Sequence, residues 1–237
     1  MKAIKPHSAA TGAGRGLRLI EHLDIARLSD EVARRVRERI IPTDFRNRII
    51  VPIGVSGRHI HLTREVLESL FGKGHELSVL RDLSQPGEFA ANETVTIVGP
   101  GGRAIERVRI LGPVRPFTQA ELSRSDGLKL GLDLPVRRTC DIAGTPGITL
   151  VGPRGTVVLK EGAIRATRHI HMSESDAVRF RLSDGQIVRA RSTGPASVIF
   201  ENVLVRVSDS FVLDFHLDTD DASAAGLDTG SFVEVMP

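Results

Sequence analysis

Two histidine pairs with matching flanks are the residues of this sequence best suited to chemistry. The tetrapeptide Arg-His-Ile-His occurs at 58–61 and again at 168–171, each time followed by a hydrophobic and a hydroxyl residue. In an extended strand, side chains alternate between faces, so the two imidazoles of a pair project to one side with Cα atoms about 6.6 Å apart. Zinc usually takes four ligands, so each pair supplies half of a predicted zinc site. The predicted ligands are His59 and His61 in one site, and His169 and His171 in the other.

A third imidazole would turn one pair into an open catalytic site, and His216 is the strongest candidate. Of the other histidines, His7 precedes the folded part, His22 lies in a predicted helix, and His75 lies in a Gly-Lys-Gly-His turn. His216 shares one face of a predicted strand with Asp214. A lone strand histidine is more often structural, but the repeated pairs favour a ligand. Duplicated zinc sites that only stabilise the fold are the alternative, although structural zinc favours thiolates and Cys140 is the single cysteine.

The elements that must position these histidines are short strands. From residue 49 onward, segments rich in β-branched residues are punctuated by Gly, Pro and Asp-Gly turns, a pattern typical of barrels or sandwiches. Helices are predicted at 63–71 and 173–180, each opened by a hydroxyl residue that can cap it. Each histidine pair directly precedes one of these helices. This long-period repeat predicts two related lobes.

Composition restricts the kinds of partner. The chain has 237 residues and a net charge of +3, with neither Trp nor Tyr. The small basic surplus and the lack of stacking rings argue against nucleic acid. No apolar run approaches the ~20 residues that cross a bilayer, so no membrane association is expected. A single cysteine provides no internal disulfide, and a reducing cytosol is the default compartment.

Several sequence blocks together resemble the PduL-type phosphotransacylases, the phosphate propanoyltransferases associated with bacterial microcompartments. The resemblance runs from about residue 48 to the end, and the blocks that carry it are GVSGRHIHL, LSQPGEFAANETVTIVGP, VRILGPVRPFTQAELSRSD, RATRHIHMSESDA and FHLDTDDASAAG. It implies a mainly β fold of two small β-barrel domains capped by short α-helices. It also implies two zinc ions per chain in an active site between the barrels. Gly57 and the Asp-Ala-Ser at 221–223 depart from the common family residues but remove no ligand.

The resemblance assigns individual roles. It implies that His59, His61 and Glu121 hold one zinc ion, that His169, His171 and His216 hold the other, and that Arg115 contacts phosphate. Ligand type alone also permits cobalt or another ion. Short-chain acyl-CoA and phosphate would be converted directly to acyl phosphate and coenzyme A, with Arg115 orienting phosphate. Cys140 is not expected to carry the acyl group, because no positioned base accompanies it.

The resemblance also bears on organisation, partners and location. We expect a flexible leader at 1–16, an amphipathic helix in 17–47, a first lobe at 48–160 and a second lobe at 161–237, with the strand near 49–55 able to pair with the second lobe. The N-terminal helix either packs on the barrels or docks to a microcompartment shell or a co-encapsulated enzyme. A homo-oligomer in the microcompartment lumen or the cytoplasm is expected. Two other functions remain open: a metal-dependent acyl-CoA or ester hydrolase, and a noncatalytic β-barrel binding module with structural zinc.

Overall fold

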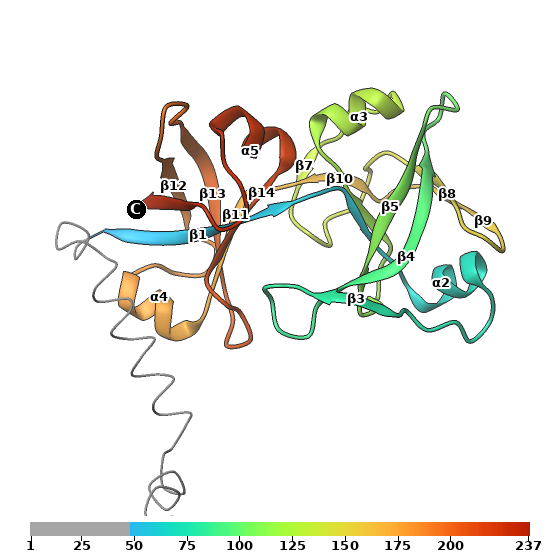
Figure 1. The fold of residues 1–237 in the computed structure, drawn as a ribbon, viewed down its shortest axis with the longest axis horizontal. Coiled ribbons are helices and arrows are strands. Elements are labelled where there is room, and N and C mark those ends of the chain that lie inside the picture. Colours follow the sequence, from blue (N-terminus) through green and yellow to red (C-terminus); the bar gives the residue numbers. More distant parts are fainter. Residues whose placement is uncertain (1–47) are drawn as a thin grey trace, which may run out of the picture. The chain divides into compact units, whose positions relative to one another are not determined.

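The computed structural model describes residues 48–237, and these residues form a mainly β fold of two lobes (Figure 1). The leader and the N-terminal amphipathic helix expected before residue 48 lie outside the described residues. Mainly β architecture with short helices is confirmed. Of the two expected barrels, one is a closed barrel and the other is an open, curled sheet.

The closed barrel has six strands in the order β1-β14-β11-β13-β12-β15. It closes because β1 pairs with β14 on one side and with β15 on the other. Alternate residues of these strands point inward and form a core that includes Phe215, Met172 and Val205. The strands are β1 (Ile49–Ser56), β11 (His169–Met172), β12 (Ile187–Ser192), β13 (Ile199–Val207), β14 (Asp214–Asp218) and β15 (Phe232–Met236).

The open sheet has nine strands, in the order β7-β10-β6-β2-β5-β4-β8-β9 with β3 paired to β4. This lobe has a separate core that includes Leu67, Ile97, Ile110 and Leu150. The strands are β2 (His59–His61), β3 (Val79–Asp82), β4 (Phe89–Val98), β5 (Ala104–Gly112), β6 (Gln119–Glu121), β7 (Val136–Arg137), β8 (Ile148–Val151), β9 (Thr156–Leu159) and β10 (Ala163–Ala166).

The chain passes between the lobes immediately before each histidine pair. β1 belongs to the barrel, and after Gly57 and Arg58 the chain continues as β2 of the open sheet. In the opposite direction, β10 belongs to the open sheet, and after Thr167 and Arg168 the chain continues as β11 of the barrel. The strands therefore change sheet between Ala166 and His169. Both histidine strands begin at the junction of the lobes (Figure 1).

Four short helices follow the strands that carry the candidate ligands. The predicted helices are confirmed as α2 (Arg64–Phe71) and α4 (Glu174–Phe180), whose N-caps are Thr63 and Ser173. The sequence did not single out the other two, α3 (Arg124–Leu130) and α5 (Thr219–Ala225), because α3 contains a glycine and the apolar residues of α5 are all alanines. Ser123 caps α3 and Asp218 caps α5, and each accepts hydrogen bonds from backbone N–H groups of the first turn.

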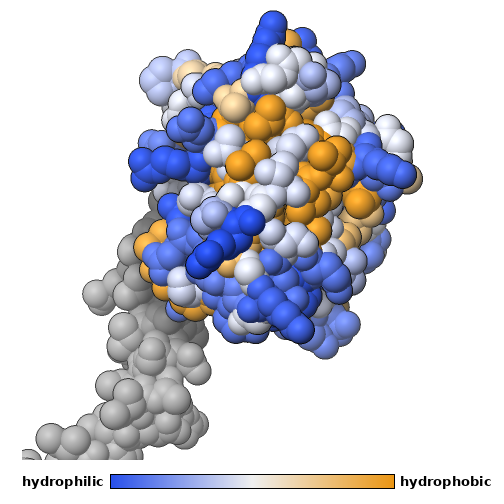
Figure 2. All heavy atoms as spheres, turned by 90° about the vertical axis from the view of Figure 1, so that its right-hand side faces the viewer, coloured by the Kyte–Doolittle hydropathy of each residue, from blue (hydrophilic) through white to orange (hydrophobic). Residues whose placement is uncertain are grey.

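Figure 2 shows the end of the open-sheet lobe, where apolar surface gathers between charged margins. Val151 of β8 and Val158 of β9, the strands at this edge of the sheet, are both exposed. Among residues 48–237, no helix combines the length and the apolar character that a membrane crossing requires.

Candidate functional site

The first candidate metal site lies on the open sheet. His59 and His61 are on β2, and antiparallel pairing with β6 places Glu121 opposite His59. The Nδ1 of His59 donates a hydrogen bond of 2.8 Å to the Gly57 carbonyl, which leaves Nε2 for a ligand. Glu121 Oε2 lies 3.5 Å from that Nε2. The three side chains are buried, and one ligand atom from each lies within 4.8 Å of the others.

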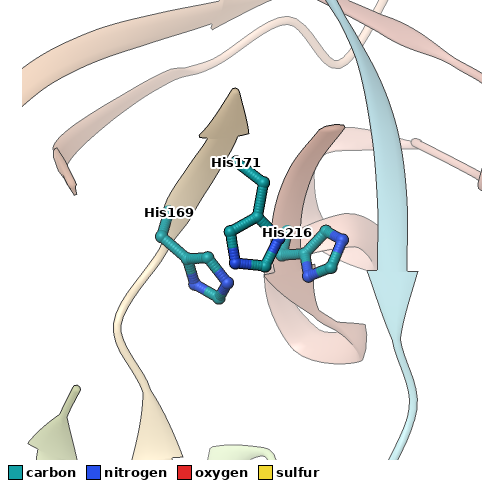
Figure 3. A group of neighbouring side chains, drawn as sticks. All are labelled: His169, His171 and His216. Atoms are coloured by element: carbon teal, nitrogen blue, oxygen red, sulfur yellow. The ribbon is translucent and has the colours of Figure 1, made fainter. Parts of the chain in front are cut away.

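The second candidate site lies on the barrel and has the same construction. β11 carries His169 and His171, and antiparallel β14 places His216 opposite His169. His169 Nδ1 donates to the Thr167 carbonyl at 2.7 Å, again two residues upstream. The three rings converge from the two strands (Figure 3), with centroids 4.7 to 5.1 Å apart. Their ligand atoms also lie within 4.8 Å of one another.

An arginine–aspartate pair braces each site in the same way. Arg58, directly before the first pair, contacts Asp126 at 2.8 Å, and Arg168, directly before the second, contacts Asp221 at 2.6 Å. Each aspartate follows the third ligand by five residues and lies in the helix that begins after it. The start of each histidine strand is therefore tied to the helix that follows the opposing strand. This construction explains why arginine is part of both tetrapeptides.

Burial keeps His61, His169 and His171 neutral. It lowers the pKa of His61 well below its ordinary value, and the neighbouring charges of His59 and Arg115 add to the effect. Burial and the adjacent His216 lower the pKa of His169 to about 4. The pKa of His171 falls to about 2 through burial and the nearby His169 and His216. A neutral imidazole keeps a lone pair for a metal, so these three residues can coordinate a metal ion at neutral pH without first losing a proton.

Buried nitrogen atoms without partners indicate that metal ions fit these sites. His61 Nδ1 and both ring nitrogens of His171 are buried and have no hydrogen-bond partner among the described residues. Leaving such atoms unsatisfied is costly, whereas a bound cation would satisfy one nitrogen of each ring. Two imidazoles with a carboxylate, and three imidazoles, are donor sets that suit zinc. Each set has three ligands and leaves a further position for substrate.

Both candidate sites line one pocket between the lobes. The pocket has about 330 Å³ of space, part of it open to solvent. His59 and Glu121 line it from the open sheet, and His169 and His216 line it from the barrel. The remaining walls come from the two crossovers with their adjoining strand ends, from the residue after β6 and from the end of β14: Ser56, Gly57, Leu122, Ala166, Thr167, Leu217 and Asp218. One histidine from each pair, His59 and His169, therefore lines the same cleft, although the two are 110 residues apart in sequence.

Arg115 lies close to both sites. Its backbone N–H donates to the Leu62 carbonyl at the end of the first histidine segment. Its positive charge lowers the pKa of His61 in one site and of His171 in the other. Glu88 accepts a hydrogen bond of 2.6 Å from Arg115 Nη2. One guanidinium nitrogen is therefore anchored, and the other N–H groups can reach a further anion.

The candidate metal ligands are thus brought together, whereas His75, the remaining histidine of residues 48–237, lies elsewhere. His75 stacks on Phe71 and contacts Glu93 at 3.1 Å, away from the pocket walls. The exposed Cys140 contributes its backbone N–H to Gln119. Sequence reasoning placed Asp214 on the strand face of His216 but assigned no role to it, nor to Glu88 or Gln119. Gln119 and Asp214 precede Glu121 and His216 by two residues, so their shared strand face was the available signal.

Comparisons with known proteins identify the family of this chain. The family model described as phosphate propanoyltransferase matches residues 52–228. The chain is 49% identical to a phosphate propanoyltransferase of Thermotoga maritima, over 88% of this chain and 99% of that protein. It is 53% identical to one of Priestia megaterium, over 76% and 82%, and 48% identical to one of Salmonella typhimurium, over 75% and 84%. With most of its length matched at this identity, the chain belongs to the phosphate propanoyltransferase family of acyltransferase enzymes.

Proposed function

We propose that this enzyme is a zinc-dependent phosphate acyltransferase that interconverts acyl-CoA plus phosphate with acyl phosphate plus coenzyme A by direct transfer. The observation that carries the proposal is the pocket lined by both histidine sites, with Arg115 close to each. Family membership supports the acyl-transfer chemistry. Short-chain acyl groups are the proposed substrates, because the phosphate propanoyltransferase name of the relatives refers to a three-carbon acyl group.

Six side chains would hold two zinc ions. His59, His61 and Glu121 form one set, and His169, His171 and His216 form the other. When bound, zinc supplies Lewis-acid stabilisation of anionic oxygens in the pocket. Burial keeps His169 and His171 neutral, so these two ligands can bind a metal ion without first losing a proton. Cobalt remains an alternative metal with the same ligands.

Arg115 is proposed to bind and orient phosphate. A guanidinium presents several N–H donors in one plane and fits two phosphate oxygens, a match that lysine lacks. Glu88 fixes one edge of this group and limits its motion. The same positive charge would stabilise the negative charge that develops on the acyl carbonyl oxygen during attack. Arg115 is therefore the proposed catalytic residue.

The reaction balances without a covalent enzyme intermediate. A phosphate oxygen attacks the carbonyl carbon of the thioester and forms a C–O bond. The C–S bond then breaks, and coenzyme A leaves as a thiolate that receives the proton carried by hydrogenphosphate. Acyl phosphate and the coenzyme A thiol are the products, and the same steps reversed make acyl-CoA.

The deciding experiment combines metal analysis with a thiol-release assay. The purified full chain is expected to contain two zinc ions and to release thiol from acetyl-CoA or propionyl-CoA only when phosphate is present. Thiol release without phosphate would instead identify a hydrolase, because water would then be the nucleophile. Tightly bound metal without turnover of either thioester would identify a binding module with structural zinc.

The proposal extends to location and assembly. Residues 17–47 are proposed to direct the enzyme into a microcompartment, where it would act as a homo-oligomer; residence in the cytoplasm is the alternative. Deletion of residues 1–41 tests this directly. An active truncated enzyme that no longer co-purifies with shells supports targeting, whereas unchanged encapsulation contradicts it. The full chain assayed in parallel is the control.

A further inference from the structure

Two buried polar residues occupy equivalent positions beside the two candidate metal sites. On β6, Gln119 lies two residues before Glu121 and opposite His61. On β14, Asp214 lies two residues before His216 and opposite His171. Gln119 is fully buried and Asp214 is 5% exposed. Polar side chains at such positions need partners, so their contacts indicate what they do.

In the first site, Gln119 donates to the third ligand. Its Nε2 donates a hydrogen bond of 2.7 Å to Glu121 Oε1. The orientation of the amide is fixed, because the Cys140 backbone N–H can only donate and lies 2.8 Å from Gln119 Oε1. Thr139 Oγ1 donates to the same Glu121 oxygen at 3.0 Å. With Oε1 holding two donors, Oε2 is the carboxylate oxygen that remains toward His59.

In the second site, Asp214 accepts from the third ligand. His216 Nε2 lies 3.0 Å from Asp214 Oδ2, and since a carboxylate only accepts, the imidazole donates and Nδ1 remains for a ligand. Ser84 Oγ, from the loop between β3 and β4 of the other lobe, donates to the same oxygen at 2.6 Å. Gly54 of β1 leaves room for this carboxylate, because a Cβ there would lie 2.7 Å from Oδ2.

The hydrogen-bonding group of each residue complements the metal ligand beside it. Glu121 is a carboxylate and is held by an N–H donor, whereas His216 is an imidazole and is held by an acceptor. We infer that Gln119 and Asp214 are positioning residues, each of which selects the ligand atom that its neighbour presents to its own metal ion. This inference rests on the proposed metal binding. Partners of this kind typically change metal affinity about 10- to 100-fold when they are removed.

The test measures the two metal affinities separately. Metal-free full-length protein is titrated with Zn²⁺ against a competing chelator, and with Co²⁺ by visible absorption. The wild type should bind two ions. The His59→Ala background isolates the barrel site, and the His169→Ala background isolates the open-sheet site. Failure of the wild type to bind two ions would contradict the proposed metal binding itself, before any positioning residue is changed.

Substitutions in these backgrounds then test the positioning residues. Asp214→Ala should lower the affinity of the barrel site for its metal ion at least about 10-fold and alter the Co²⁺ spectrum of that site. The affinity of the open-sheet site should not change. Asp214→Asn keeps an acceptor oxygen and should restore part of the affinity. Gln119→Glu keeps the size of the side chain but removes its N–H donors, and should lower only the metal affinity of the open-sheet site. Asp209→Ala removes an exposed carboxylate of the barrel lobe and serves as the matched control.

Site selectivity separates positioning from a general structural role. A residue that only supports the fold would lower both affinities together, and would leave the Co²⁺ spectrum of the ions that still bind unchanged. Equal weakening of both ions, or affinities within about twofold of the parent, would overturn the inference. Should Asp214→Ala fail to fold, Ser84→Ala replaces it, since Ser84 is exposed and contacts the same oxygen. That variant should lower the metal affinity of the barrel site alone, and an unchanged affinity at that site would again count against the inference.

Discussion

At the scale of single residues, Arg115 has the clearest predicted effect. Arg115→Lys keeps the positive charge but loses the planar set of donors that fits both Glu88 and phosphate. We expect kcat/KM for phosphate to fall about 10- to 100-fold, the equivalent of one charge-assisted hydrogen bond. Steady-state thiol release at varied phosphate measures this. Arg103→Lys, at an exposed arginine between β4 and β5, is the control, and an unchanged phosphate dependence in Arg115→Lys would remove Arg115 from the mechanism.

Cys140 provides a second residue-scale prediction. The structure uses its backbone N–H to orient Gln119, and alanine preserves that group. Cys140→Ala should therefore keep most of the acyltransferase activity, measured by the same thiol-release assay. Complete loss of activity in a folded variant would show that the thiol carries the acyl group, and direct transfer would be wrong.

The lowered pKa values of the histidines predict how pH affects the metal-free protein. His169 has its pKa lowered to about 4, whereas an unfolded histidine titrates near 6.5. Between these values the unfolded chain binds the extra proton, so the free energy of unfolding must fall as pH falls. The loss is up to about 1.4 kcal/mol per pH unit for each such histidine. Urea unfolding of metal-free protein at pH 7.5, 6 and 5 measures it, and stability that does not depend on pH would contradict the burial argument.

At the scale of elements, each histidine strand is tied to a helix of its own lobe. Arg58 precedes β2 and is the partner of Asp126, which is 3% exposed in the first turn of α3. Arg58→Met should leave that carboxylate buried without its cation and lower the free energy of unfolding by about 1–3 kcal/mol. Urea unfolding checks this, with Arg124→Met as the matched change at an exposed arginine, expected within about 0.5 kcal/mol of wild type. Equal effects of the two changes would show that the ion pair does not hold the strand.

At the scale of the whole molecule, the two candidate sites share one pocket and should act as one unit. His59→Ala and His169→Ala should each reduce acyl transfer by at least about 100-fold, and the double variant should lose little more, because groups that act together are not additive. Thiol-release rates for the three variants measure this. His75→Ala changes a histidine outside the pocket walls and should keep its activity. Half the wild-type rate in each single variant would instead indicate two independent sites.

Local sequence patterns were sufficient for several features of this molecule. Alternation along a strand places His59 with His61, and His169 with His171, whatever the rest of the fold does. Hydroxyl residues after each pair predicted the caps of α2 and α4, since a cap is satisfied within its own first turn. Composition and strand spacing predicted a mainly β fold. The resemblance to known sequences added Glu121 and Arg115, which no local pattern marks.

Tertiary structure alone decided how these parts meet. Sheet partners are remote in sequence, so no local rule specifies that β1 joins the barrel while β2, three residues later, joins the open sheet. That exchange of strands, repeated in reverse from β10 to β11, brings residues of both candidate metal sites to one pocket. It also lets Ser84 of one lobe contact Asp214 of the other. Strand geometry determined which side chains share a face, and long-range pairing determined which faces share a pocket.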